Sequence, residues 1–272
     1  MVNRRGAQWM LLAAALVSGG TSAQPSGAAL CLSGSNTVGQ KLAPALVRAW
    51  AAAQGWTVQR EGQPAVDETR LTLDTPRGPL VVDVLAHGTS TGFAALRDGR
   101  CDLWMASRAV RADEVRAAAA IGPLYEEGQA HVLALDGLAV IVHPQNPVAA
   151  LSVAEVRDVF AGRIRDWSRL GGAPGPIALH ARDDRSGTYD TFRALVMGDA
   201  PLSASAARYE STDALSAEVA ADPRAIGFVG LAGVGRTRAL PLSERETRPM
   251  APTPLAVATE DYVLARRLFL YS

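Results

Sequence analysis

Three short segments rich in glycine, serine and threonine are the residues best suited to bind a ligand. They are Ser33–Gly39, Gly88–Gly92 and Ser186–Thr188, and each follows an apolar run and precedes a helical pattern. Taken singly, each would more simply be a cap and turn. A helix N-terminus, however, presents unpaired N–H groups and a partial positive charge, glycine allows close approach, and hydroxyls add donors. The three segments together therefore favour a site for a tetrahedral oxyanion.

Two arginines are candidates for the positive charge of this site. Arg182 stands four residues before Ser186, and its guanidinium could bind two oxygens of one anion. Asp184 is expected to hold Arg182 in place. Arg108 follows Ser107 at the end of another apolar run and is the second candidate. A surface ion pair for Arg182 and a solvated side chain for Arg108 are the alternatives.

Apolar runs predict a strand before each of these segments. Ala29–Leu32 precedes the first segment, Leu80–Leu85 the second and Pro176–His180 the third, while Asp102–Ala106 precedes Ser107. Strands that alternate with helical patterns at this spacing are typical of α/β folds with parallel sheets. In such sheets ligands bind at the carboxyl ends of the strands, which is where all three segments lie.

The remaining patterns continue this alternation. Ser152 and Glu155 have the spacing of a capping box, which predicts a helix from there to about Phe160. Residues 57–77 are polar and are expected to form a hairpin or a loop. Further helices are expected over about 42–50, 93–98, 111–120, 189–197 and 212–221, and further strands over 138–142, 225–229 and 266–271. The last strand pattern ends directly before Ser272, so we expect the chain to be truncated.

Composition limits the class of protein. The chain has 272 residues, of which 48% are hydrophobic and 20% charged, as in globular proteins of one large domain or two lobes. It has 27 basic and 27 acidic residues, without the basic excess typical of proteins that bind nucleic acid. Its histidines show no metal-ligand spacing, and two cysteines are too few for a four-thiolate zinc site, so no metal or other cofactor is expected.

The first 23 residues have the pattern of a secretory signal peptide. Arg4 and Arg5 precede the apolar stretch Trp9–Val17, and small residues lead to an expected cleavage after Ala23. The apolar stretch is shorter than the roughly 20 residues of a membrane span, although an uncleaved anchor is the alternative. The mature chain is therefore expected in the periplasm. In that oxidising space Cys31 and Cys101 could form a disulfide or remain two free thiols.

The second glycine segment also permits an enzymatic interpretation. Gly88–Gly92 matches the G-x-S-x-G nucleophile elbow of serine hydrolases, which would need an acid and a histidine further along the chain. His131, His143 and His180 are available but stand in no recognisable context, so we expect no enzyme. His87 adjoins the segment, and if protonated it would favour an anion and make affinity sensitive to pH.

Six stretches resemble the periplasmic phosphate-binding protein of high-affinity phosphate ABC transporters. Four contain the candidate ligands: Ser33-Gly-Ser-Asn-Thr37, Gly88-Thr-Ser-Thr-Gly92, Asp102-Leu-Trp-Met-Ala-Ser-Arg108 and Arg182-Asp-Asp-Arg-Ser-Gly-Thr188. The others are Leu151–Trp167, which is similar to a family helix that leads into an F-x-G-x-I-x-x-W pattern, and Ala225–Val229. The resemblance covers about residues 29–271.

The resemblance implies a two-lobed, Venus-flytrap fold of type II, in which each lobe is a mostly parallel sheet flanked by helices. The first lobe would comprise residues 24–138 and 250–272, and the second 139–249, with crossings near 136–140 and 245–252. Phosphate would lie between the lobes. Carried over by position, its ligands would be Ser35, Asn36, Thr37, Thr89, Ser90, Ser107, Arg108, Arg182, Ser186, Gly187 and Thr188, with Asp184 bracing Arg182.

One residue departs from the family pattern. Well-known members have an aspartate after the third-strand serine, where it accepts a proton from hydrogen phosphate, whereas this chain has Arg108. Preference for phosphate over sulfate is therefore less secure. The resemblance implies a monomer that captures inorganic phosphate for the permease of an ABC transporter. A binder of another oxyanion, such as sulfate or molybdate, and a periplasmic adaptor without a transport role are the alternatives.

Overall fold

The computed structural model describes residues 28–118, 129–244 and 247–272. The expected signal peptide and the end of the helix expected over 111–120 lie outside these ranges. The strands are β1 (Ala28–Gly34), β2 (Thr57–Gly62), β3 (Glu68–Thr75), β4 (Gly78–Leu85), β5 (Leu103–Ala106), β6 (Ala130–Val142), β7 (Leu151–Ser152), β8 (Ala178–Arg182), β9 (Ala207–Tyr209), β10 (Ala225–Gly230), β11 (Arg238–Ala239), β12 (Leu242–Ser243) and β13 (Ala265–Tyr271).

The helices follow the strands in alternation, as the sequence predicts. They are α2 (Ala43–Ala53), α3 (Thr89–Arg97), α4 (Ala112–Ala117), α5 (Val153–Phe160), α6 (Gly187–Phe192), α7 (Thr212–Ala221) and α8 (Pro254–Ala258), with the helical turns η2 (Val38–Leu42), η3 (Trp167–Leu170), η4 (Arg193–Met197) and η5 (Leu231–Gly233). The capping box of α5 is confirmed, because Ser152 Oγ accepts from Glu155 N at 3.1 Å. Within the described ranges, the helices are all too short or too polar to cross a membrane.

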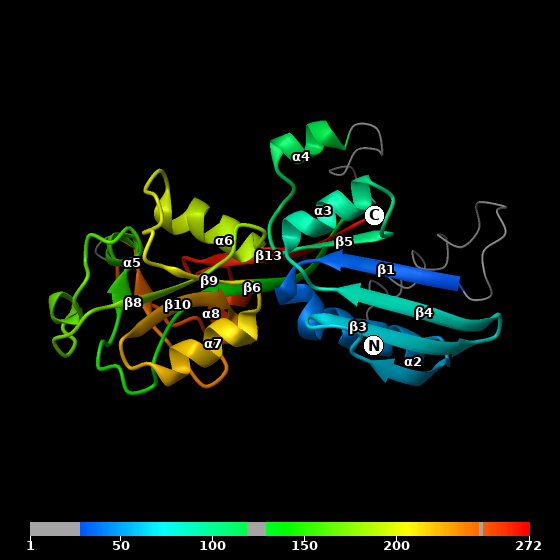
Figure 1. Ribbon diagram of the computed structural model, residues 1–272, viewed down its shortest axis with the longest axis horizontal. Helices are drawn as coiled ribbons and strands as arrows, with labels where there is room; N and C mark the ends of the chain where they lie inside the picture. The colour runs from blue at the N-terminus through cyan, green and yellow to red at the C-terminus, as the bar shows by residue number, and fades with distance from the viewer. Residues whose placement is uncertain (1–27, 119–128, 245–246) are drawn as a thin grey trace.

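The first lobe is built on three parallel strands. β1 lies between β4 and β5, with Leu32 opposite Val84 on one side and Leu103 on the other. β3 adds to β4 in antiparallel fashion, and β2 forms the outer edge, where every residue is exposed. Residues 57–77 therefore form the hairpin and not the loop. Helix α2 and η2 pack on one side of this sheet and α3 on the other (Figure 1).

The second lobe has its own parallel strands. β8 lies between β9 and β10 and runs parallel to both, and β6 adds to β10 in antiparallel fashion. β10 is apolar and buried along its whole length, as expected for a central strand. The two groups of elements lie at opposite ends of the molecule, and the α/β fold is confirmed (Figure 1). The sheet is mixed, because antiparallel strands flank the parallel strands of each lobe and join them in one sheet.

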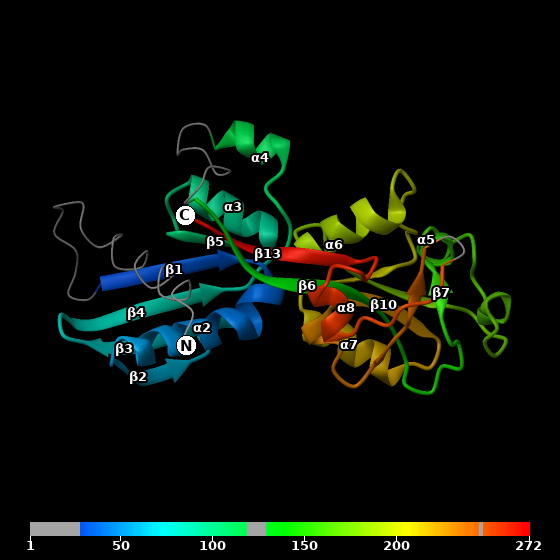
Figure 2. The ribbon, with the colours of Figure 1, turned by 180° about the vertical axis from the view of Figure 1, so that it is seen from behind.

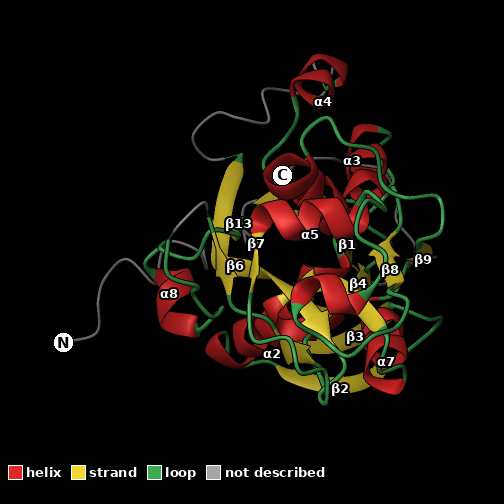
Figure 3. Cartoon of the chain, turned by 90° about the vertical axis from the view of Figure 1, so that its left-hand side faces the viewer, coloured by secondary structure: helices red, strands yellow, loops and turns green. Residues whose placement is uncertain are grey.

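Strands β6 and β13 connect the lobes. The first part of β6 pairs with β13, from Ala130 opposite Tyr271 to Gly137 opposite Ala265. From Leu138 onward β6 pairs with β10 of the second lobe. This change of partner falls within the crossing expected near 136–140. The two strands run side by side from one lobe to the other (Figure 2), along one side of the molecule (Figure 3).

The chain returns to the first lobe through β13, later than the expected crossing near 245–252. Val257, Tyr262 and Leu264 pack in the core of the second lobe, and Tyr262 Oη donates to Leu138 O at 2.9 Å. These residues stand beyond the boundary expected at residue 250, because the α8 segment covers β6 before the chain turns back. The division of the chain at residues 139 and 250 stays a prediction.

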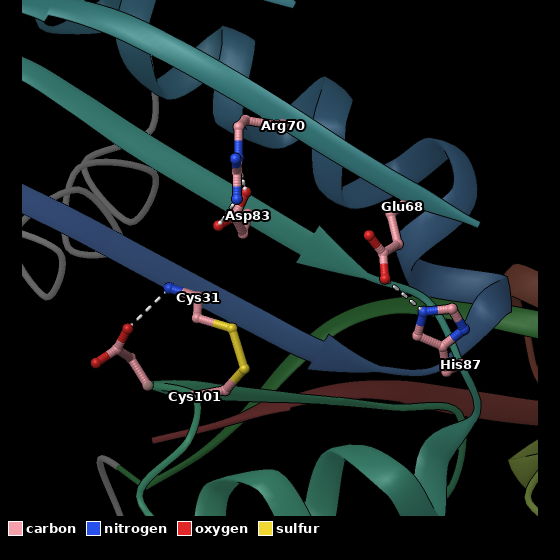
Figure 4. The surroundings of a disulfide bond; sticks show 7 residues. Cys31, Glu68, Arg70, Asp83, His87 and Cys101 are labelled. Carbon is pink, nitrogen blue, oxygen red and sulfur yellow. Dashed lines mark hydrogen bonds and ion pairs between the residues drawn. A yellow bond between two sulfur atoms is a disulfide. The ribbon is translucent and has the colours of Figure 1, made fainter. Parts of the chain in front are cut away.

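A disulfide joins two neighbouring strands of the first lobe. Cys31 of β1 is bonded to Cys101, which precedes β5, and their Cα atoms are 4.7 Å apart (Figure 4). The structure thus selects the disulfide over two free thiols. Seventy residues separate the cysteines, and closing a loop of that size in the unfolded chain is worth about 4 kcal/mol in the chain-entropy model. The bond ties together two of the strands whose ends carry candidate ligands.

Candidate anion-binding site

The candidate ligands lie where the two lobes face each other. β1, β4 and β5 of the first lobe and β8 of the second end at this boundary (Figure 1). The predicted segments follow three of them and begin η2, α3 and α6. Gly88 has a φ of 105°, and a Cβ there would lie 2.6 Å from the carbonyl oxygen of Arg185 in the second lobe. Glycine at this position therefore permits the lobes to approach each other.

Two buried hydroxyls of the first lobe form one part of the site. Thr89 Oγ1 lies 3.3 Å from Ser107 Oγ and accepts from Ser107 N at 3.2 Å. Gly187, at the start of α6, lies directly against both hydroxyls, and a Cβ on it would be 2.6 Å from Ser107 Oγ and closer still to Thr89. The N-terminus of α6 thus reaches this pair only because residue 187 has no side chain.

The second part of the site combines hydroxyls of both lobes. Ser186 Oγ caps α6 by accepting from Thr188 N at 3.2 Å and Tyr189 N at 3.4 Å. Thr188 Oγ1 lies 3.2 Å from Thr37 Oγ1 of the first lobe. Two hydroxyls at this spacing can donate to the same small anion.

Arg182 is a buried cation with uncharged partners. Arg182 is 1% exposed. Its guanidinium donates to two side chains, at Thr212 Oγ1 (2.7 Å) and Asn36 Oδ1 (2.8 Å). It also donates to two backbone carbonyl oxygens, those of Tyr209 (3.2 Å) and Glu210 (2.5 Å). Burial is the main cause that lowers the pKa of Arg182 to about 10; the charge of Arg266 acts in the same direction, and the more distant carboxylates of Asp183, Asp67 and Glu210 oppose it.

A charge in this environment attracts an anion. Across residues 28–118, 129–244 and 247–272, no carboxylate lies within ion-pair distance of Arg182. A buried charge without a counter-ion costs several kcal/mol, so buried cations are normally paired. An oxyanion that enters between the lobes would supply the missing negative charge.

Arg266 is a site residue that the sequence analysis missed. It lies in β13, is 7% exposed, and donates to Thr188 Oγ1 at 3.0 Å and Thr37 Oγ1 at 3.2 Å. Asp136 Oδ2 accepts from its Nε at 2.9 Å and its Nη2 at 2.7 Å. The two residues stand opposite each other in the β6–β13 register. The arginine was visible at the start of the last strand pattern, but its place in the site depends on that pairing.

The predicted role of Asp184 is wrong. Its side chain is 83% exposed and pairs with Arg208 at 2.7 Å. The carboxylate points to solvent beyond the end of β8, while the guanidinium of Arg182 turns inward to Asn36 and Thr212. Arg208 reaches Arg182 only at its backbone, donating to the carbonyl oxygen at 2.8 Å.

The predicted role of Arg108 as an anion ligand is also corrected. Its Nη1 and Nη2 donate to the two carboxylate oxygens of Glu114, each at 2.7 Å, and its Nε donates to Asp190 Oδ2 at 2.7 Å. Two carboxylates neutralise the guanidinium and occupy its donors. Since Glu114 belongs to α4 and Asp190 to α6, Arg108 joins the two lobes.

The remaining predicted residues line the boundary. Ser35 Oγ accepts from Val38 N at 3.4 Å, and the Asn36 amide bonds both Ala86 O and the guanidinium described above. Ser90 N donates to the carbonyl oxygen of Arg185 at 3.2 Å. Their direct contact with an anion stays a prediction.

The nucleophile-elbow interpretation finds no support in the structure. His87 faces Glu68 and Glu210, His180 Nδ1 lies 3.0 Å from Tyr209 Oη, and His143 Nδ1 accepts from Gln145 N at 3.1 Å. In the described part of the chain, none of these rings bonds Ser90. The same ranges hold no cluster of histidine, cysteine, aspartate and glutamate suited to a metal ion.

Two lobes connected by paired strands, with the candidate ligands at their boundary, are the architecture of two-lobed binding proteins. Residues 57–271 match the family model of the PBP superfamily domain, and the chain belongs to this family.

Two curated relatives are similar over about two thirds of this chain. "Protein SphX" of Synechococcus elongatus is 28% identical over 201 residues, which cover 70% of this chain and 59% of that protein. "Phosphate-binding protein PstS" of Bacillus subtilis is 28% identical over 181 residues, which cover 66% and 57%. The chain thus matches less than two thirds of the length of these relatives.

Solved structures support the fold. A putative phosphate ABC transporter substrate-binding protein with bound phosphate from Clostridium perfringens superposes with a TM-score of 0.71 at 23% identity, covering 90% of this chain and 86% of that one. An ABC-type phosphate transport receptor from Vibrio cholerae gives a TM-score of 0.61 at 24% identity, with coverages of 89% and 87%.

Proposed function

We propose that this chain is a periplasmic solute-binding protein that captures inorganic phosphate between its lobes and presents it to the permease of an ABC transporter. The observation that carries the proposal is the buried guanidinium of Arg182, which has only uncharged partners. One curated relative is named a phosphate-binding protein, and two similar structures are named as parts of phosphate transporters. These names favour phosphate as the anion. The protein would act as a monomer and bind without catalysis.

Binding would favour the closed arrangement, because each lobe holds only part of the donor set. Thr37, Thr89 and Ser107 belong to the first lobe, and Arg182 and Thr188 to the second. An anion between them gains contacts to both only when the lobes are together, so it shifts the population toward closure. Many donors fixed around one small anion are consistent with a Kd of about 1 µM or below, a free energy near −8 kcal/mol.

Charge balance also fits a single small anion. Arg266 is paired directly with Asp136, whereas Arg182 has only uncharged hydrogen-bond partners and feels carboxylates only at longer range. The N-termini of α3 and α6 add partial positive charge without adding ions. The site therefore matches a compact oxyanion better than a large or neutral ligand.

Selectivity among oxyanions would depend on a proton acceptor. Hydrogen phosphate has an O–H to donate and sulfate has none, so a free carboxylate facing the anion would favour phosphate. The position after Ser107 holds Arg108, whose guanidinium is taken up by Glu114 and Asp190. We therefore expect sulfate and molybdate to compete with phosphate more strongly than they would at a site with an acceptor there.

Titration calorimetry of the anion-stripped mature protein tests the proposal. Phosphate is titrated alone and against sulfate, arsenate and molybdate. Saturable 1:1 binding of phosphate near 1 µM or tighter is the expected outcome. A preference for another oxyanion would keep the binding mechanism and change the ligand. Absence of binding for all four anions would overturn the proposal and favour an adaptor role.

A further inference from the structure

A histidine at the lobe boundary lies between two carboxylates, one from each lobe. His87 follows β4, and its Nε2 lies 3.0 Å from Glu68 Oε1 of β3 (Figure 4). Its Nδ1 lies 3.0 Å from Glu210 Oε1, which belongs to the second lobe. The side chain is 31% exposed, so the contact is partly shielded from water. Both ring nitrogens of His87 therefore contact these carboxylates. The position of His87 beside Gly88–Gly92 in the sequence had suggested a direct effect on the anion.

Both contacts are satisfied only by the protonated ring. A neutral imidazole has one N–H and one lone pair, so one of its nitrogens would direct a lone pair at a carboxylate oxygen. The imidazolium donates from both nitrogens and adds charge attraction at each. Burial alone would lower the pKa of His87, but its hydrogen bonds to Glu68 and Glu210 outweigh burial and leave the pKa above its usual value.

The second-lobe partner of His87 is also part of the support of the anion site. The backbone carbonyl of Glu210 accepts from Arg182 Nη2 at 2.5 Å. Its side chain accepts from Arg185 at 3.0 Å, and Arg185 in turn pairs with Asp183 at 2.8 Å. Glu210 thus contacts His87 through its side chain and the buried Arg182 through its backbone.

We propose that His87 is a positioning residue that takes up a proton when the lobes close and so couples phosphate affinity to pH. The inference rests on the proposed function, in which the anion binds the closed arrangement. Glu68 lies in the same lobe and stays beside His87 in both states, whereas Glu210 leaves when the lobes part.

The sign of the effect follows from this difference. The pKa of His87 is higher in the closed state than in the open state, because only closure adds the second carboxylate. The contact stabilises the closed state most at low pH and loses its effect as pH rises through the closed-state pKa. Arg185 opposes the proton by its charge, but Asp183 and Glu210 pair with it. Asp67, beside Glu68, is occupied by Gln40 at 2.7 Å.

The phosphate Kd at pH 5.5, 7.0 and 8.5 tests the inference in the wild type and in His87→Gln, Glu210→Gln, Glu68→Gln and His143→Gln. Phosphate itself titrates in this range, but its protonation cancels in the ratio of variant to wild-type Kd at each pH. For His87→Gln and Glu210→Gln we expect a ratio of about 10 at pH 5.5, falling toward 1 at pH 8.5, since a pKa difference of one unit corresponds to tenfold. Glu68→Gln should give a smaller ratio, and His143→Gln a ratio of 1 throughout.

The outcomes separate the inference from the proposed function. A ratio for His87→Gln that does not change with pH would overturn the coupling and leave phosphate capture intact. If the wild type binds no phosphate, the proposed function fails and the inference, which rests on it, fails with it. If phosphate binds, the pKa of His87 from NMR titration should rise by about one unit on saturation of the wild type but not of Glu210→Gln, and an equal pKa in free and saturated wild type would overturn the proton uptake.

Discussion

Two buried arginines at the lobe boundary differ in the charge of their partners. Arg182 donates to a hydroxyl, an amide oxygen and two carbonyls, whereas Arg108 donates to the carboxylates of Glu114 and Asp190. Arg182 therefore has no carboxylate in direct contact, whereas the charge of Arg108 is paired directly. Both would read from sequence as basic residues at strand ends, so only their partners distinguish an anion ligand from an ion pair that joins the lobes.

Arg266 stands between these cases. It has one carboxylate partner, Asp136, and donates two further N–H groups to the two threonine hydroxyls of the site. Its charge is balanced, but it orients hydroxyls that belong to different lobes. The three arginines thus form a series from free charge to fully paired charge, and replacing each should have a different mixture of effects on binding and on stability.

The largest expected effect on binding comes from Arg182→Ala. Phosphate affinity should fall by about 1,000-fold, near 4 kcal/mol, because the uncompensated charge and its hydrogen bonds are lost together. Calorimetry measures the affinity. In anion-free buffer the melting temperature should fall little or rise, since an unpaired buried charge is removed.

Arg224→Ala is the matched control, because that arginine pairs with Asp222 on the surface and lies away from the site. It should change neither affinity nor circular dichroism. An Arg182→Ala protein that folds and binds phosphate as tightly as the wild type would refute the assignment of the site.

Arg266→Ala should weaken both properties. The change leaves Asp136 buried without its cation and releases Thr37 and Thr188, so we expect about 3 kcal/mol loss of unfolding free energy and a ~30-fold loss of affinity. Chemical denaturation measures the unfolding free energy, and calorimetry measures the phosphate affinity. The double variant Arg266→Met with Asp136→Leu separates them, since it removes both charges. Stability should recover in it while affinity remains low, and recovery of full affinity would show that Arg266 only supports the fold.

Arg108→Ala should have the smallest effect on binding. Removing the cation leaves Glu114 and Asp190 with only the more exposed Arg111 as a shared counter-ion, which we expect to cost about 2 kcal/mol of unfolding free energy. Affinity should fall less than ~5-fold, because the anion is not in contact with this guanidinium. Chemical denaturation measures the unfolding free energy, and calorimetry at constant ionic strength measures the affinity. A loss of affinity as large as that of Arg182→Ala would mean that Arg108 contacts the anion after all.

Most elements could be predicted because their signals are local. The capping box of Ser152 and Glu155, the helix over 212–221 and the buried strand over 225–229 depend on neighbouring residues, and the structure has all three. The long strand β6 was anticipated only over 138–142. Its first part carries His131 and Asp136, and polar residues there hide the apolar pattern of a strand that changes sheet.

For the candidate site too, local sequence signals predicted some features and distant contacts decided the others. Glycine, serine and threonine after apolar runs, with an arginine nearby, predicted an oxyanion site at strand ends before any fold was known. The partners of Arg182 lie 27 to 146 positions away along the chain, from Tyr209 to Asn36, so its uncharged surroundings could not be anticipated from its neighbours in the sequence. Arg266 and Asp136, 130 positions apart, meet only through strand pairing. Local chemistry therefore predicted the kind of ligand, and the tertiary contacts decided which cations are paired directly with carboxylates and which are not.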